Sequence, residues 1–162
     1  MKHSAKNYCL LLLVIVMILF LGYYRDFVFK TVNSLIQSID YEALYVTPPS
    51  LKFLDQYTKG TLTNIKWLLT FLFSLAYLMV ALAAIRIIFN RRKYSLIMIG
   101  VYAVVMLLSG LFMILGAAFE GLSDRMYEFA RYLMGMVQSP IILMIMIPAF
   151  KLSGSEPNNI TN

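Results

Sequence analysis

One stretch of sequence decides the fold: "YSLIMIGVYAVVMLLSGLFMILGAAF", at residues 94–119, contains no charged side chain. A helix of roughly 20 apolar residues is long enough to cross the hydrocarbon core of a bilayer. On either side of this stretch, residues 8–24, 67–89 and 132–150 form further apolar blocks. The sequence therefore predicts an all-α polytopic membrane protein, with four transmembrane helices bundled into a single integral membrane domain over residues 1–162.

The composition agrees with this class of protein. Charged residues make up 14% of the chain and hydrophobic residues 60%, whereas a soluble domain carries about 25% charged residues. The net charge of +6 does not indicate a nucleic-acid partner, because the basic residues flank the apolar blocks. A single cysteine, Cys9, excludes an internal disulfide. With a single histidine, His3, in the N-terminal tail, we expect neither a metal site nor any other cofactor.

The distribution of Lys and Arg predicts the orientation. These residues are denser in the N-terminal tail, the turn at residues 86–93 and the C-terminal tail than in the opposite segments, which hold seven of the eight acids. The positive-inside rule then places both termini on the inner side. The first block reads as an uncleaved signal anchor, because no small-residue cleavage site follows it.

The predicted outer loop, residues 25–66, is long for a simple connector. Its first part, "FVFKTVNSLIQSID", predicts an amphipathic helix along the outer surface. The "VTPPS" sequence should end that helix, with Ser50 capping a second short helix that Gly60 closes. The loop is interpreted either as a cap over the outer end of the bundle or as a docking surface for a partner. The apolar residues that share the helical face are Val28, Val32, Leu35, Ile36 and Ile39.

Small residues recur on one face of the third block. Small side chains let helix backbones approach closely in lipid. The face is interpreted either as packing against the other three spans or as a seam for another protein. Its members are Gly100, Ala103, Gly110 and Ala117.

The last block, residues 132–150, contains two prolines and a glutamine. Pro140 cannot donate to the carbonyl of Met136, so the helix should kink there. Gln138 and Ser139 are the strongly polar pair of the four blocks, and they are interpreted as a source of an interhelical hydrogen bond. A polar side chain near the proline, with Gln138 as the candidate, can also satisfy the freed carbonyl. Arg131, just before the block, should mark the outer water boundary.

Charged residues gather directly outside this block. Arg125, Glu128 and Arg131 are spaced three apart and predict a salt-bridged helical turn. An enzymatic site at the outer interface is the alternative, and it would also use Glu120 and Asp124. No acid lies inside any of the four blocks, which argues against a proton-coupled antiporter and an intramembrane aspartyl protease.

The last block resembles a known family. It begins with an arginine and an aromatic residue, continues with a glutamine and a proline, and ends in "PAF" near the C-terminus. This pattern is similar to that of the small exosortase-associated membrane proteins of Bacteroidota, which are encoded beside exosortase F and its relatives. The matching residues are Arg131, Tyr132, Gln138, Pro140, Pro148, Ala149 and Phe150.

The resemblance implies a non-catalytic accessory protein in the bacterial inner membrane. Its protein partner would be an exosortase, a membrane-embedded transpeptidase that processes the sorting tags of exported proteins. This chain would not be the enzyme, because Cys9 and His3 lie at the inner end in the predicted topology. A small transporter or channel subunit is the alternative, and it would need a polar path at depth.

Overall fold

The computed structural model describes residues 5–41, 45–119 and 123–153, and all its regular structure is helical. The elements follow in the order α1 (Ala5–Tyr41), the short 3₁₀ helix η1 (Pro49–Gln56), α2 (Lys59–Phe89), α3 (Arg92–Ala118), α4 (Ser123–Val137) and α5 (Ile141–Ser153).

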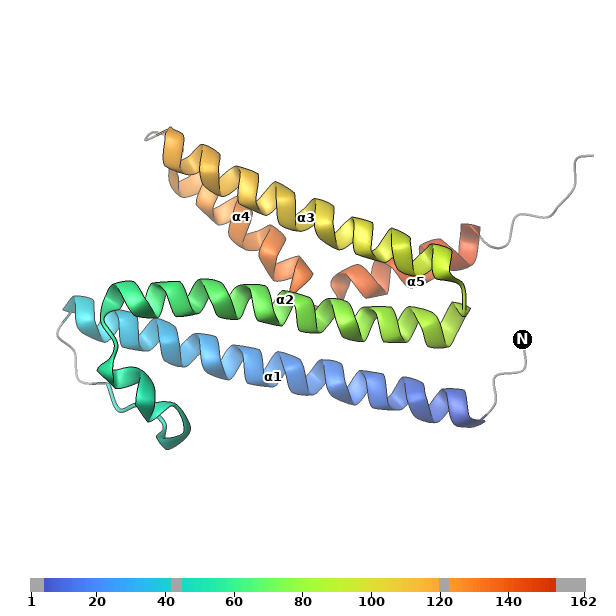
Figure 1. The fold of residues 1–162 in the computed structure, drawn as a ribbon, viewed down its shortest axis with the longest axis horizontal. Helices are drawn as coiled ribbons and strands as arrows, with labels where there is room; N and C mark the ends of the chain where they lie inside the picture. The colour runs from blue at the N-terminus through green and yellow to red at the C-terminus, as the bar shows by residue number, and fades with distance from the viewer. Residues whose placement is uncertain (1–4, 42–44, 120–122, 154–162) are drawn as a thin grey trace, which may run out of the picture.

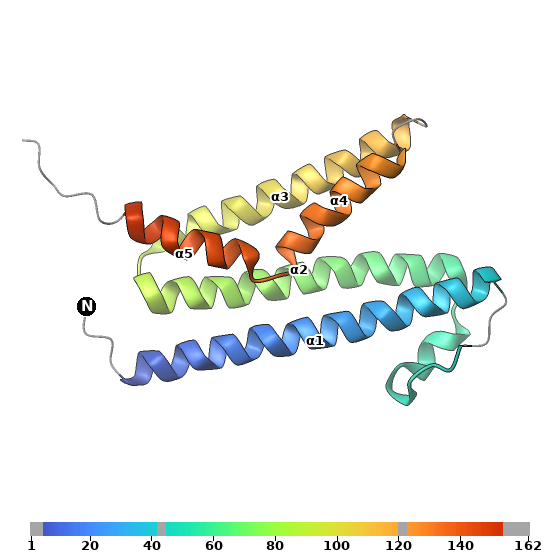
Figure 2. The same ribbon diagram turned by 180° about the vertical axis from the view of Figure 1, so that it is seen from behind.

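The helices run back and forth along one long axis (Figures 1 and 2). α1 packs along α2, while α4 folds back along α3, and the two pairs meet mainly through α2. The N-terminal end of α1, the α2–α3 turn and the C-terminal end of α5 lie at one end of the molecule, here called the terminal end. The opposite end, where α1 and α3 finish and α2 and α4 begin, is called the loop end.

Among the described residues, three helices are long and apolar enough to cross a membrane: α1, α2 and α3. The bent pair α4–α5 becomes a fourth crossing if it is counted as one span. The angle between its two helices is 61°. The prediction of helices long and apolar enough to cross a membrane is therefore confirmed, but the last block is two helices rather than one kinked helix.

The first block does not end where the sequence analysis placed its end. α1 continues without interruption through Arg25 and Asp26 to Tyr41, so the predicted outer amphipathic helix is the last part of α1. The sequence up to Tyr41 holds no proline, and the helical hydrogen bonds need no apolar side chain to continue past the two charged residues.

The start of α2 also differs from the prediction. Thr58 is the N-cap, with its backbone in the extended region and its Oγ1 accepting from the amide of Thr61 at 3.5 Å. Gly60 therefore lies in the first turn of α2 and closes no helix. Ser50 lies within η1, whose N-cap is Pro48. A threonine hydroxyl satisfies an otherwise unpaired amide at a helix start, which explains why α2 begins there.

Two apolar cores hold the fold together. The larger begins at mid-length and reaches the terminal end, and it includes Tyr77, Tyr102, Val137 and Phe150. The smaller lies at the loop end, where η1 packs on α1 and α2. Its buried residues are Val28, Val32, Leu35, Leu51, Leu54 and Leu62.

Candidate functional site

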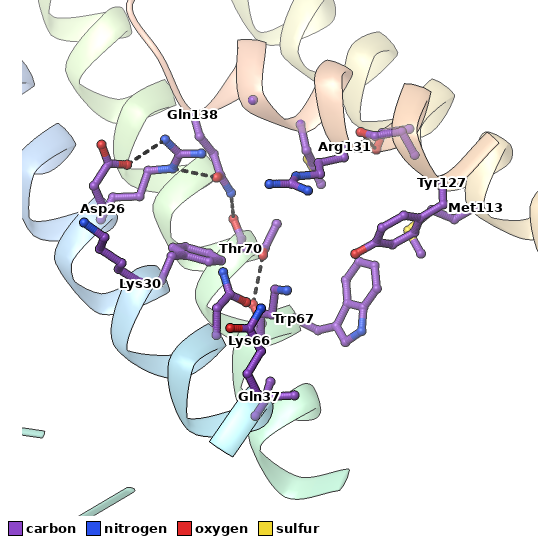
Figure 3. A pocket seen from close by; sticks show the side chains of 18 residues that line it. Asp26, Lys30, Gln37, Lys66, Trp67, Thr70, Met113, Tyr127, Arg131 and Gln138 are labelled. Carbon is purple, nitrogen blue, oxygen red and sulfur yellow. Dashed lines mark hydrogen bonds and ion pairs between the residues drawn. The ribbon is translucent and has the colours of Figure 1, made fainter. Parts of the chain in front are cut away.

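A groove of about 740 Å³ opens toward the loop end, with walls from α1, α2, α3 and α4 (Figure 3). Asp26 and Lys30 of α1 lie on one side, and Trp67 of α2 and Tyr127 of α4 lie on the other. A smaller pocket of about 490 Å³ adjoins it, since Arg25 and Arg131 line both. These cavities are the candidate site.

Three of the cations in the groove lie directly beside an apolar block of the sequence. Arg25 follows the apolar block at residues 8–24, Lys66 precedes the block at 67–89, and Arg131 precedes the block at 132–150. Each is therefore the first charge beyond an apolar block. The fold brings the three together from α1, α2 and α4, although the sequence separates them by tens of residues.

Gln138 anchors the groove floor. It is 3% exposed, and its Oε1 accepts from the Nε of Arg25 at 2.9 Å. Arg25 also forms an ion pair with Asp26 at 3.1 Å, and its guanidinium lies 5.7 Å from the ring centre of Phe29. The guanidinium is thus fixed by three separate contacts, which reduces the entropy lost when it binds an anion.

The amide nitrogen of Gln138 connects this arrangement to α2. Nε2 donates to the carbonyl of Thr70 at 2.7 Å and to the Oγ of Ser74 at 3.2 Å. The Ser74 hydroxyl in turn donates to the same Thr70 carbonyl at 2.8 Å. A single buried side chain therefore ties α1 and α2 to the point where α4 ends, and its hydrogen-bonding groups are satisfied.

Gln138 thus forms the predicted interhelical hydrogen bond, but another residue satisfies the carbonyl freed at the α4–α5 break. The carbonyl of Met136 accepts from the amide of Ser139 at 3.3 Å and from its Oγ at 2.9 Å. The same Oγ lies 3.4 Å from the amide of Ile141, the first residue of α5. Ser139 rather than Gln138 compensates for Pro140, because its short side chain reaches back one turn whereas Gln138 extends to α2.

Lys66 and Arg131 both line the groove. Among the described residues, neither side chain forms a hydrogen bond or an ion pair, and their like charges repel each other. Arg131 lies in the middle of α4 rather than at a helix end, and Figure 3 shows its guanidinium turned toward Gln138. Two unpaired cations at close range create a positive potential that an anion would relieve.

The salt-bridged turn predicted in α4 does not form. Arg125, Glu128 and Arg131 all lie within α4, but no ion pair links them. The two ion pairs of the described residues are Arg25–Asp26 and Lys59–Asp40. Glu120 lies outside the described residues. Within the described ranges, no three His, Cys, Asp or Glu side chains converge as they would around a metal ion.

The other motif residues take different places. Tyr132 lines the smaller pocket. Pro148 lies inside α5. Phe150 is buried at the terminal end against Tyr94 and Phe89, with ring centres 4.6 and 5.8 Å apart. The motif therefore serves two regions, the groove and the terminal core.

The small-residue face of α3 points away from the rest of the chain. Gly100, Ala103 and Gly110 are exposed, and a Cβ added at either glycine would meet nothing within 4 Å. The side chain of Ala117 lies outside the described residues. The interpretation that this face packs against the other spans is therefore wrong for its described members. The close approach between helices occurs instead at Gly22 of α1, where an added Cβ would lie 3.3 Å from the hydroxyl of Tyr77.

Three residues of α2 were not recognised as parts of one site from the sequence. Lys66 and Thr70 line the groove, and the buried Ser74 contacts Gln138. They are spaced four apart and therefore share one stripe of α2. This polar stripe at the start of an apolar block was the available signal. From the sequence, Arg25 is only a charge at the end of the first apolar block, and no neighbouring residue indicates that Gln138 is its hydrogen-bonding partner.

No family model, curated protein or solved structure matches this chain. In the part of the chain that the structure describes, the fold is all-helical, with three helices long and apolar enough to cross a membrane, or four spans when the bent pair α4–α5 is counted as one.

Proposed function

We propose that this protein is a non-catalytic accessory subunit of a membrane-embedded sorting system of the exosortase type, and that it acts by binding through its cationic groove. The observation that carries the proposal is the position of the motif's polar residues. Arg131 and Gln138, which carry the family resemblance, both line the groove, and Tyr132 lines the pocket beside it.

The groove has the properties of a binding site. Arg25 is held in place by Gln138 and Asp26, so its guanidinium is preorganised. Lys66 and Arg131 remain available for a ligand. Preorganised charge at a site lowers the cost of binding. The arrangement supports recognition of an anionic group better than it supports chemistry, since it brings together cations and amides rather than a nucleophile and a base.

The packing below the groove argues against the transporter or channel alternative. Beyond Gln138, the apolar core continues toward the terminal end through Tyr77, Tyr102 and Val137, all nearly or fully buried. A transport path needs polar groups along its depth. The groove is thus closed at its floor in this conformation.

In the proposed arrangement, the four spans cross the bacterial inner membrane with the loop end outside. The N-terminal end of α1 and the C-terminal end of α5 then lie together on the inner side, which agrees with their position at the same end of the molecule in Figure 1. The groove opens toward the outer face, where exosortase substrates arrive.

Affinity capture tests the proposed partnership. The full-length protein, tagged at its C-terminus and expressed with the exosortase encoded nearest to its gene, should recover that enzyme from a mild detergent extract. A Gln138→Leu variant should recover it less well than a Ser139→Ala variant, because only the former removes the groove floor. Recovery of the tagged protein alone, under conditions that keep another membrane complex intact, would refute the partnership.

A further inference from the structure

The depth of the groove follows from the boundaries of the apolar blocks. Arg25, Lys66 and Arg131 are each the first charged residue beyond a block, and all three line the groove. The first charges beyond an apolar span lie in the headgroup layer of a bilayer, where basic side chains meet lipid phosphates. The convergence of these three cations therefore places the polar part of the groove at the level of the phosphates, while Ser109 and Met113, from inside the apolar block of α3, line its deeper part.

The charge balance of the groove is strongly positive. Four cations line it, Arg25, Lys30, Lys66 and Arg131, against one carboxylate, Asp26. That carboxylate is 76% exposed and pairs with Arg25 alone. The other three cations have no hydrogen-bonding or ion-pairing partner among the described residues, and the charges of Lys66 and Arg131 repel each other. A ligand that carries a compact negative charge would satisfy all of them.

The groove also has an apolar and aromatic lining. Phe29, Trp67, Met113 and Met134 contribute to its walls. Trp67 is 46% exposed and begins the apolar block of α2, as expected of an aromatic residue at the membrane interface. The groove therefore combines cations with a surface suited to hydrocarbon, which matches an amphipathic ligand.

We propose that the groove binds the phosphate headgroup of an anionic membrane lipid. Arg131 and Lys66 bind the phosphate, and Arg25, held by Gln138, supports it from α1. The glycerol and the first part of the acyl chains lie against Trp67 and Met113. The inference rests on the proposed function only in treating the groove as a binding site, and it does not depend on the protein partner.

Native mass spectrometry of the purified full-length protein in mild detergent tests the inference. The probes are dioleoylphosphatidylglycerol and dioleoylglycerol, which share acyl chains but differ in the phosphate. The wild type should retain the first lipid and not the second. A Lys66→Gln/Arg131→Gln variant should bind it about 100-fold more weakly, at about tenfold for each charge-assisted hydrogen bond lost.

The matched control removes two cations at the other end of the molecule. Arg91→Gln/Arg92→Gln changes the net charge equally but lies in the α2–α3 turn, so its lipid affinity should stay within about twofold of the wild type. A Lys66→Arg/Arg131→Lys exchange keeps both charges and should retain lipid binding. If the double Gln variant does not keep its helical circular dichroism, the single Lys66→Gln variant takes its place, with an expected loss of about tenfold.

Three outcomes would overturn the inference. Equal retention of the two lipids by the wild type would show that the phosphate is not recognised. Undiminished lipid binding by a folded Lys66→Gln/Arg131→Gln variant would place the lipid elsewhere. Inorganic phosphate that binds as tightly as the lipid would assign the groove to a soluble ligand. Because the isolated protein is used, these results are independent of the capture experiment on the partner.

Discussion

The Nε of Arg25 in α1 donates a hydrogen bond of 2.9 Å to the Oε1 of Gln138 at the end of α4, although 113 residues separate them in the chain. The amide of the same glutamine donates to α2. Gln138 is therefore the point at which the α1–α2 pair and the α3–α4 pair are joined by polar contacts. The groove above it depends on this junction.

Replacing Gln138 by leucine should lower the free energy of unfolding by about 2 kcal/mol. The change removes the oxygen that accepts from Arg25, so the half-buried guanidinium loses this hydrogen bond. Ser139→Ala should cost less than about 1 kcal/mol, because the Met136 carbonyl still accepts from the backbone amide at 139. Unfolding by SDS in mixed micelles measures both values. An equal loss in the two variants would contradict the junction role of Gln138.

The contact between Gln138 and Ser74 should appear as a coupling energy. Ser74 is fully buried, and its Oγ lies 3.2 Å from Nε2 of Gln138. In a double-mutant cycle of Ser74→Ala and Gln138→Leu, we expect a coupling of about 0.6 to 1.7 kcal/mol, the range of hydrogen bonds between membrane helices. A cycle of Gln138→Leu with Ser38→Ala, at the far end of α1, should give no coupling. Coupling of the same size in both cycles would refute a direct contact.

A large side chain at Gly22 should separate α1 from α2. Even a methyl group there would lie 3.3 Å from the Tyr77 hydroxyl, so Gly22→Leu should destabilise the protein by about 1 to 3 kcal/mol through overpacking. Gly100→Leu is the matched control, because nothing lies within 4 Å of a Cβ at that exposed position. Thermal unfolding in detergent compares the two. A greater loss at Gly100 would show that the face of α3 is packed in solution, for example against a second copy.

Phe150 should carry a large part of the stability at the terminal end. It is 4% exposed and packs on Tyr94 and Phe89. Phe150→Ala should cost about 3 kcal/mol, as the removal of a buried aromatic side chain usually does. Leu107→Ala, at a side chain that is 74% exposed, should cost less than about 0.5 kcal/mol. Similar losses in the two variants would contradict the assignment of Phe150 to the core.

The two ends of the molecule should differ in their access to water-soluble thiol reagents. In a Cys9→Ser background, Lys93→Cys at the start of α3 should react only after the inner membrane is opened. Lys59→Cys at the start of α2 should react in spheroplasts with the membrane intact. Labelling of both sites in intact spheroplasts would contradict the proposed topology, and the reversed pattern would place the termini outside.

Much of the fold was predictable because its signals are local. The apolar block at residues 67–89 lies within α2, and the block at residues 94–119 lies within α3 except for its last residue, since a long apolar run is readable without knowledge of its neighbours. The predicted end of the first helix is wrong because a charged residue, Arg25, does not end α1, which continues to Tyr41. In lipid or at its surface a charged side chain does not break a helix, because the backbone hydrogen bonds stay inside the helix.

The site was less predictable. Arg131 and Gln138 were named from the sequence, and Pro140 correctly marked the break between α4 and α5. The partner of the Met136 carbonyl was assigned to the wrong side chain, however, and Lys66, Thr70 and Ser74 were not connected to Gln138. Which side chain reaches which group depends on the direction in which each helix face turns after packing.

The sequence by itself determined that the chain is helical, apolar and marked by charges directly beside its apolar blocks, because these properties follow from composition and local periodicity. Only the tertiary structure decided that Arg25, Lys66 and Arg131 meet in one groove, that Gln138 joins α1 and α2 beneath them, and that the small-residue face of α3 turns outward. The physical reason is that helical periodicity defines the faces of each helix, whereas the choice of which faces meet belongs to packing between helices that lie far apart in the chain.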